Sequence, residues 1–247
     1  MGTRYNPSIP KVGHLECHFD PADNISYPAG GTVMYDLSGR NNNHNLTNWS
    51  VVSGSEMIQS GSNVPIFRTT LDDDGDGQGT SVADASNANF VVGSKNASFS
   101  FWFRKVADSD NSNDLYSADR DDANGVRITV DNSGGVSFNT NSQGNNLATG
   151  NVISDDTWYN IVCTMDDKRK EVYLNGVLNV STGSATTAGH AGPTISYNRN
   201  ENFGTLHGVN KGYSLKGNFG PITVWNVRLS PDEVKQNFNA HRGRFGI

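Results

Sequence analysis

The stretch TWYNIVCTMDDKRKEVYLNGVLNV at residues 157–180 decides the fold of this chain. Apolar side chains occupy every second position from 159 to 165, which is typical of a strand with one buried face. A second strand follows a polar turn, and Asn175-Gly176 then supplies the two residues with positive φ that a tight hairpin turn requires. The stretch therefore predicts a three-stranded antiparallel meander.

Alternating apolar positions predict further strands on both sides of this meander. They lie in three stretches, each with side chains that share one face: Leu15, Cys17 and Phe19; Phe99, Phe101 and Phe103; Val126, Ile128 and Val130. The third stretch runs into the turn at 132–135 and a further short strand, which predicts a hairpin. Strands separated by turn signals at this spacing are typical of an antiparallel sandwich or barrel.

A last strand and one helix are expected near the C-terminal end, where residues 217–226 carry the strand pattern. Ser230 fits the N-cap position, Pro231 the first turn and Glu233 the capping-box position. Val234 and Phe238 lie four residues apart, so both would face the sheet. The predicted fold class is all-β with one short C-terminal helix.

The composition supports this fold class. Asn, Gly and Ser number 31, 27 and 25 of the 247 residues, and all three favour turns over helix interiors. A helical bundle and a helix-rich α/β enzyme are therefore excluded, and the 23 aromatic residues argue against disorder. The net charge of −6 arises in residues 72–122, which carry eleven acids and four bases, so a chain-wide basic surface for nucleic acid is absent.

The domain organisation follows from periodicity. Residues 1–13 contain two prolines and no periodic pattern, and they predict an extended arm that is either disordered or laid on a neighbouring subunit. Residues 14–247 predict a single domain. Cys17 and Cys163 lie in alternating apolar patterns and are interpreted as buried thiols, with a disulfide between them as the alternative. An apolar signal core and an apolar run of membrane-spanning length are both missing, so we expect synthesis without a signal peptide.

Three ordered stretches resemble laminin-G-like, concanavalin A-like domains. They are DPADNISYP at 20–28 with YDLSGRNN at 35–42, the meander at 157–177, and FGPITVWNVRLS at 219–230. The resemblance implies a concanavalin A-type jelly-roll sandwich. The ending QNFNAHRGRFG at 236–246 is similar to the tail of such domains in tailed-phage virion proteins, which implies a virion protein. This fold hosts lectins, adhesion modules, glycosidases and structural decorations, so the resemblance leaves the function open.

The strongest chemical motif is an acidic loop. Asp72, Asp74 and Asp76, followed by Gly77, match the first half of a D-x-D-x-D-G loop, in which alternate carboxylates supply the oxygen ligands that Ca²⁺ prefers. Position 83, where an EF-hand requires Glu, is Ala83, so an EF-hand is excluded. The two interpretations are a calcium site and a solvated acidic turn.

Candidate glycan contacts are polar or aromatic side chains that can hydrogen-bond sugar hydroxyls or stack on a sugar ring: Asp119, Arg120, Asp122, Trp49 and Tyr197. The alternative for the acidic members is solubility and loop geometry. Trp102 and Trp225 lie opposite the most apolar faces of their strands. They are therefore expected either to be exposed or to pack against a second sheet.

Two further chemical interpretations are weak. His14, Glu16 and His18 share one strand face, which would suit zinc, but the outer face of a terminal strand is the favoured interpretation. The glutamates lack the E-x-D-x-E pattern of sandwich glycosidases, and the chain has no G-x-S-x-G nucleophile elbow. The sequence therefore predicts a protein that is not an enzyme, with a glycan-degrading enzyme as the least favoured class.

The function that the sequence predicts is a non-catalytic virion structural protein, either a capsid decoration or a tail-associated knob, that displays a lectin-like sandwich. Assembly is expected through the N-terminal arm and Arg228, Arg242 and Arg244, in contact with other virion proteins and as an oligomer. The alternative is a carbohydrate-binding module for host-surface glycans, in one version dependent on calcium. Nucleic acid and membrane are not expected partners, and the expected location is the virion, after synthesis in the host cytoplasm.

Overall fold

The computed structural model describes residues 8–28, 32–47, 49–52, 66–69, 79–82, 96–107, 112–118, 125–140, 145–167, 169–182, 201–204 and 215–247. Within these ranges the strands are β1 (Leu15–Phe19), β2 (Val33–Met34), β3 (His44–Thr47), β4 (Trp49–Val52), β5 (Ile66–Thr69), β6 (Gly79–Val82), β7 (Ala97–Lys105), β8 (Ser112–Ala118), β9 (Val126–Asp131), β10 (Gly135–Thr140), β11 (Asn145–Asn151), β12 (Trp158–Met165), β13 (Lys170–Leu174), β14 (Val177–Ser181), β15 (Asn202–Phe203) and β16 (Gly217–Trp225). The helix α1 spans Pro231–His241, and the short 3-10 helices η1 and η4 span Val12–His14 and Arg242–Arg244.

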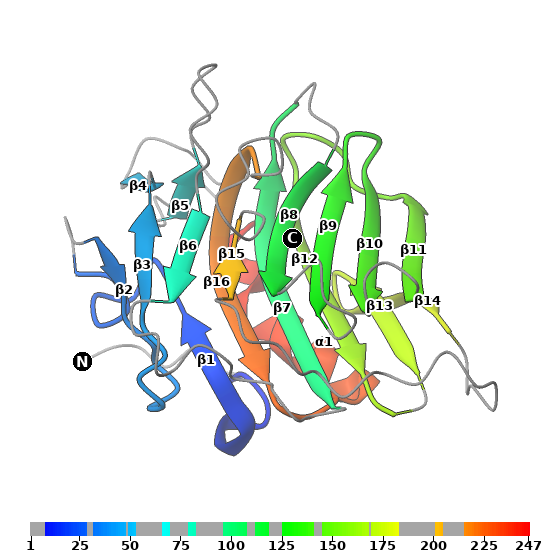
Figure 1. Cartoon of the computed structure of the whole chain (residues 1–247), viewed down its shortest axis with the longest axis horizontal. Helices are drawn as coiled ribbons and strands as arrows, with labels where there is room; N and C mark the ends of the chain where they lie inside the picture. Colours follow the sequence, from blue (N-terminus) through cyan, green and yellow to red (C-terminus); the bar gives the residue numbers. More distant parts are fainter. Residues whose placement is uncertain are drawn as a thin grey trace.

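The strands form two layers (Figure 1). An eight-stranded sheet has the order β14-β13-β12-β7-β16-β5-β4, with β1 also paired to β16. A five-stranded sheet of order β11-β10-β9-β8-β15 lies across from it, and a three-stranded sheet of order β2-β3-β6 lies beside β15. Every recorded strand pair is antiparallel. The predicted all-β sandwich with one short C-terminal helix is confirmed.

The predicted meander is formed by β12, β13 and β14. Ile161 lies opposite Leu174, and Leu174 lies opposite Val177 across the turn. Asn175 and Gly176 have φ angles of 49° and 78°, which is the left-handed conformation that a tight hairpin turn requires. The meander is thus confirmed down to its turn.

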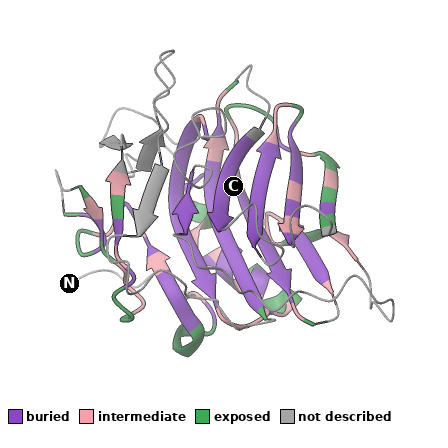
Figure 2. Cartoon of the chain, in the orientation of Figure 1, coloured by how far each residue is buried: buried purple, intermediate pink, exposed green. Residues whose placement is uncertain are grey.

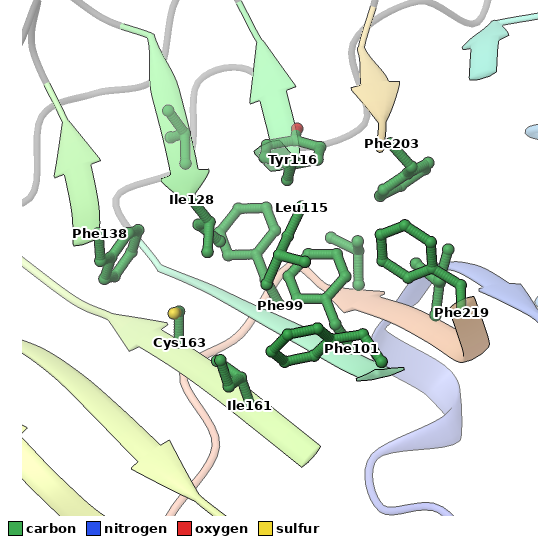
Figure 3. Close-up of a cluster of buried hydrophobic side chains, with 14 of the residues drawn as sticks. Phe99, Phe101, Leu115, Tyr116, Ile128, Phe138, Ile161, Cys163, Phe203 and Phe219 are labelled. Carbon is green, nitrogen blue, oxygen red and sulfur yellow. The ribbon is translucent and has the colours of Figure 1, made fainter. Parts of the chain in front are cut away.

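The main core fills the space between the two layers. Its aromatic side chains come from both sheets and include Phe99 and Phe101 of β7, Phe138 of β10 and Phe203 of β15, all fully buried (Figure 3). Phe99 contacts Tyr116 with ring centroids 4.9 Å apart. Large aromatic rings bury much apolar surface per residue, which is how a chain that is only 34% hydrophobic builds a core.

The helix α1 begins where the capping signals predicted. The Ser230 hydroxyl accepts from the backbone N–H of Glu233, and the Glu233 carboxylate accepts from the backbone N–H of Ser230. This reciprocal pair satisfies two of the donors that a helix start leaves open. Val234 packs with Trp225, Tyr173 and other buried residues, so α1 covers the outer face of the eight-stranded sheet (Figure 1).

An aromatic cluster completes this cover. Trp102 stacks on Phe238 and on Phe245, with ring centroids 5.6 and 4.3 Å away, and Phe245 also contacts Trp158 with ring centroids 4.6 Å apart. A Cβ at Gly220 would lie 2.6 Å from the Phe245 ring, so only glycine leaves room for it there.

The expected positions of Trp102 and Trp225 are therefore wrong. They are 1% and 0% exposed, so neither is open to solvent. Nor do they pack against the second sheet, since their partners are the helix, the C-terminal segment and the chain near β1. Strand alternation correctly predicted that both side chains point away from the core between the sheets. It did not predict that α1 and the C-terminal segment cover them.

The described part of the predicted arm lies on its own chain. The Trp225 indole N–H donates to the Pro10 carbonyl at 2.9 Å, and the Gln236 amide donates to the Ser8 carbonyl at 2.7 Å. Lys11 forms an ion pair with Glu233 at 3.2 Å. Residues 8–11 thus join α1 in covering the sheet, whereas residues 1–7 lie outside the described residues.

Cys17 and Cys163 are free and buried, which confirms the prediction of buried thiols and excludes the disulfide. Burial raises the pKa of both thiols, which disfavours the reactive thiolate. In the described part of the chain, no helix combines the length and apolar character needed to cross a membrane.

Phe245→Ala tests the aromatic cover. Because the ring is fully buried against two tryptophans, its truncation should lower the free energy of unfolding by about 3–5 kcal/mol. Urea unfolding followed by tryptophan fluorescence measures this loss. Val177→Ala, at a side chain 69% exposed, is the control and should change stability by less than about 0.5 kcal/mol. Equal effects of the two variants would contradict the assigned role of Phe245.

Candidate functional site

The predicted metal and glycan residues lie mostly outside the described residues. This applies to Asp72, Asp74 and Asp76 of the acidic loop and to Asp119, Arg120, Asp122 and Tyr197. Trp49 opens β4 opposite Thr69, but its side chain is outside the described part. Among the side chains that the structure does describe, no three His, Cys, Asp or Glu residues are grouped to hold a metal ion.

The three arginines predicted to mediate assembly differ in their surroundings. Arg228 pairs with Glu171 and Asp166, and Arg244 makes a two-pronged ion pair with Asp20 at 2.7 and 2.8 Å. Arg242 is exposed, with its guanidinium 5.7 Å from the centre of the Phe238 ring. The structure thus uses Arg228 and Arg244 inside the domain and leaves Arg242 on the surface.

The shared face of His14, Glu16 and His18 does not bring the three side chains to one point. The His14 ring contacts the Asn226 amide oxygen at 3.2 Å, and the His18 ring contacts the Thr223 hydroxyl at 2.9 Å. Glu16 pairs with Arg40 at 3.3 Å. Glu16 also accepts from the Asn226 amide N–H₂, so His14 and Glu16 share one neighbour. His18 is held separately by Thr223, which supports the interpretation as the outer face of a terminal strand.

A second group of ionisable residues has the composition of a catalytic site but is closed. The Tyr173 hydroxyl donates to the Glu171 carboxylate at 2.8 Å, and the Thr164 hydroxyl donates to the same oxygen at 3.2 Å. Burial, together with the hydrogen bond and charge of Glu171, raises the pKa of Tyr173, so it stays protonated. Tyr173 is 1% exposed, which denies access to a substrate. The group fastens the chain after β16, through Arg228, to β13.

The outer face of the five-stranded sheet carries a row of polar side chains. In the strand register Ser117 of β8 lies opposite Arg127 of β9, which lies opposite Asn139 of β10, which lies opposite Asn146 of β11. Asn202 of β15 continues the row beyond Ser117. Strand alternation places these side chains on the face away from the core, because their neighbours Ile128, Phe138, Leu147 and Phe203 belong to the core. Five strands thus present hydroxyl, guanidinium and amide groups in one line.

The row has a buried part and an open part (Figure 2). Ser117, Asn202 and Arg127 are less than 10% exposed, whereas Asn139 is half-buried and Asn146 is exposed. Ser137 and Ala148 form the next cross-strand pair on the same face, and they are half-buried and exposed. The open part of the row therefore lies on β10 and β11 and is uncharged.

A buried ion pair stabilises the inner part of the row. Arg127 donates to the Asp114 carboxylate through Nε at 2.9 Å and through Nη2 at 2.8 Å. The Asp114 side chain is fully buried and the Arg127 side chain is 10% exposed. A charge removed from water requires a partner with good geometry, and here the pair joins β8 to β9 beneath the polar row.

Sequence reasoning missed this row because only the register between strands aligns its members. The outward direction of Arg127 and Asn139 was readable, since each follows an apolar residue of an alternating strand pattern. Asn146 carries no such signal. The central strands of the eight-stranded sheet, by contrast, have their outer faces covered by α1 and the C-terminal segment. The polar row is therefore the candidate functional site.

Comparisons with known proteins agree with the fold. Residues 74–235, more than half of the chain, match the family described as the concanavalin A-like lectin/glucanases superfamily. No curated protein sequence matches the chain.

The chain is similar in fold to several solved structures. One is Trypanosoma rangeli sialidase in complex with sialic acid, with a TM-score of 0.65 and 16% identity over 95% of this chain and 34% of the sialidase. Another is the binding domain of Paraclostridial Mosquitocidal Protein 1, with a TM-score of 0.65 and 17% identity over 93% of this chain and 53% of that one. The chain therefore spans about a third of the sialidase and half of the binding domain. At these identities the likeness shows the fold alone.

Asp114→Asn tests the support beneath the polar row. Removing the carboxylate charge takes from the buried Arg127 its ionic partner on β8, so the free energy of unfolding should fall by about 3–5 kcal/mol. Urea unfolding provides the measurement. Asp156→Asn makes the same change in the Arg104–Asp156 pair, where the aspartate side chain is 62% exposed, and should cost less than about 1 kcal/mol. A loss for Asp114→Asn no larger than this control would show that the buried pair contributes little.

Proposed function

The chain belongs to the concanavalin A-like lectin/glucanase superfamily, and from this premise we propose that it is a non-catalytic, lectin-like module that binds glycans as part of a phage particle. The observation that carries the glycan-binding part is the polar row on the outer face of the five-stranded sheet. A sandwich has two outer faces, and here α1 and the C-terminal segment occupy the other one.

The chemistry of the open part suits a ligand rich in hydroxyl groups. Asn139 and Asn146 each offer an amide N–H₂ donor and a carbonyl acceptor, and they lie directly opposite each other in adjacent strands. Ser137, one pair further along, adds a hydroxyl. Sugar hydroxyls both donate and accept hydrogen bonds, so such groups can pair with them without a charge on the ligand.

Two observations support a role without catalysis. Retaining glycosidases require two carboxyl groups about 5–5.5 Å apart that flank the substrate, whereas the open residues of β10 and β11 are uncharged. The described cluster around Glu171 and Tyr173 is closed by burial. Release of reducing ends from a host polysaccharide by the purified protein would overturn this part of the proposal.

The particle-associated part rests on the similarity of residues 236–246 to virion-protein tails. In this chain that segment supplies Phe238 and Phe245 to the aromatic cover. Attachment to other virion proteins would use the surface that remains open, including Arg242. Cryo-electron microscopy of the native assembly tests this; a particle without density for the sandwich would refute it.

Calcium is proposed at the acidic loop of Asp72, Asp74 and Asp76. If the loop binds the ion in the folded state alone, millimolar CaCl₂ should raise the melting temperature by several degrees through linkage. Thermal unfolding with CaCl₂, MgCl₂ and EDTA measures this, and Asp74→Asn should abolish the calcium-specific rise. An identical melting temperature in all three conditions would leave the loop as a solvated acidic turn.

A glycan array tests the binding face. The wild-type protein should bind a set of hydroxyl-rich glycans, and Asn139→Ala with Asn146→Ala should weaken binding at least about tenfold, because hydrogen bonds worth about 1–1.5 kcal/mol each are lost. Asn179→Ala is the matched control, an exposed asparagine on β14 of the other sheet, and should bind like wild type.

The array also separates the two parts of the proposal. Binding that is unaffected by the double variant would place the glycan elsewhere on the domain, such as the predicted rim loops. Absence of binding to every glycan, with and without calcium, would refute the lectin-like function and leave only the structural role in the particle.

A further inference from the structure

Two histidines meet where the C-terminal helix ends against β1. The rings of His18 in β1 and His241 in α1 have centroids 6.3 Å apart and an interplanar angle of 31°. His18 Nδ1 lies 2.9 Å from the Thr223 hydroxyl, and His241 Nδ1 lies 3.5 Å from a guanidinium nitrogen of Arg244. Both side chains are half-buried, and neither belongs to the polar row or to the glycan-binding proposal.

The charged side chains next to His18 and His241 are already paired with each other. Arg244, from η4, is held by both oxygens of Asp20, at 2.7 and 2.8 Å. Asp23 and Asp36, in the segments after β1, act on His18 from further away, and β16 contributes the uncharged Thr223. A proton on His241 would therefore place a second cation beside Arg244, whose carboxylate partner is already engaged.

The electrostatic surroundings favour the neutral imidazoles. Burial, reinforced by Arg244 and His18, lowers the pKa of His241 to about 3. Burial also lowers the pKa of His18, against the opposing effect of Asp20. A histidine freed from these contacts has a pKa of about 6.5. The docked state thus binds fewer protons, so docking is strongest above pH 6.5 and weakens as the pH falls from there toward 3.

We propose that His18 and His241 form an acid-sensitive latch, which holds α1 and the C-terminal segment on the eight-stranded sheet at neutral pH and releases them on acidification. Arg244 joins the latch to the aromatic cover, because Phe245 follows it directly and stacks on Trp102 and Trp158. Acidification would then expose the aromatic cover of Trp102, Trp158 and Phe245 to solvent more often, whereas the core between the two sheets, which forms a separate cluster, keeps its protection.

Hydrogen exchange of the wild-type protein tests the latch. Protection factors, corrected for the intrinsic pH dependence of exchange, are measured at pH 7.5 and 5.0 for residues 231–247 and for β7 and β12. Asp20 remains ionised at pH 5.0, because burial raises its pKa but the hydrogen bonds and charges around it, chiefly those of Arg244, together lower it below its usual value. We expect protection of 231–247 to fall at least about tenfold, with the two strands unchanged. Constant protection of the helix, or an equal fall in helix and strands, would overturn the proposal.

His241→Asn assigns the effect to the latch. Asparagine keeps a polar atom near the position of Nδ1 but cannot gain a proton, so the pH-dependent loss of protection should shrink severalfold. His14→Asn is the matched control, because His14 lies on the exposed surface just before β1, and it should behave like wild type. An undiminished loss in His241→Asn would refute the latch. If the helix of His241→Asn is already undocked at pH 7.5, the proposal is decided by the hydrogen exchange of the wild-type protein at the two pH values.

Discussion

The structure depends on the burial of the central strands of the eight-stranded sheet on both of their faces. All nine residues of β16 are buried, and so are eight of the nine residues of β7. A strand in a sandwich normally turns every second side chain to water, and this sheet cannot do so while Trp102 and Trp225 lie on its outer side. The core between the sheets satisfies one face. The other face requires α1, the tail with Phe245 and the segment around Pro10, which converge on it from opposite ends of the sequence.

This requirement makes the domain asymmetric. One outer face is apolar, aromatic and covered, and the other is polar and partly open. Some polar groups on the covered face are hydrogen-bonded to one another, as when the Asn160 and Asn237 amides both donate to the Ser100 hydroxyl. On the opposite sheet the amides of Asn139 and Asn146 are directed outward instead. One face is covered and the other partly open because the outward-facing aromatic side chains lie on the strands of the eight-stranded sheet.

Much of this could be predicted from local sequence and some of it could not. The meander, its Asn175-Gly176 turn and the capping box at Ser230 depend on neighbouring residues, and the structure confirms each of them. Trp102 is buried by Phe238 and Phe245, which lie more than a hundred residues away in the sequence. Strand alternation along β7 therefore could not predict that its side chain is covered. The polar row depends on the register that sets Arg127 opposite Asn139. The candidate metal and glycan residues in the loops lie outside the described residues, so those predictions stay as the sequence made them.

The pairing of β1 with β16 has a consequence for how the chain folds. Leu15 lies opposite Trp225, and Phe19 opposite Ile222, so this ladder closes a loop of some two hundred residues. Contacts of such high sequence separation slow folding, because the entropy of closure is lost before the contacts form. On the ribosome β1 must wait for its partner until residues 217–225 have emerged, and β7 must wait for the same strand. The unpaired edges of these early strands are most vulnerable to aggregation in that interval.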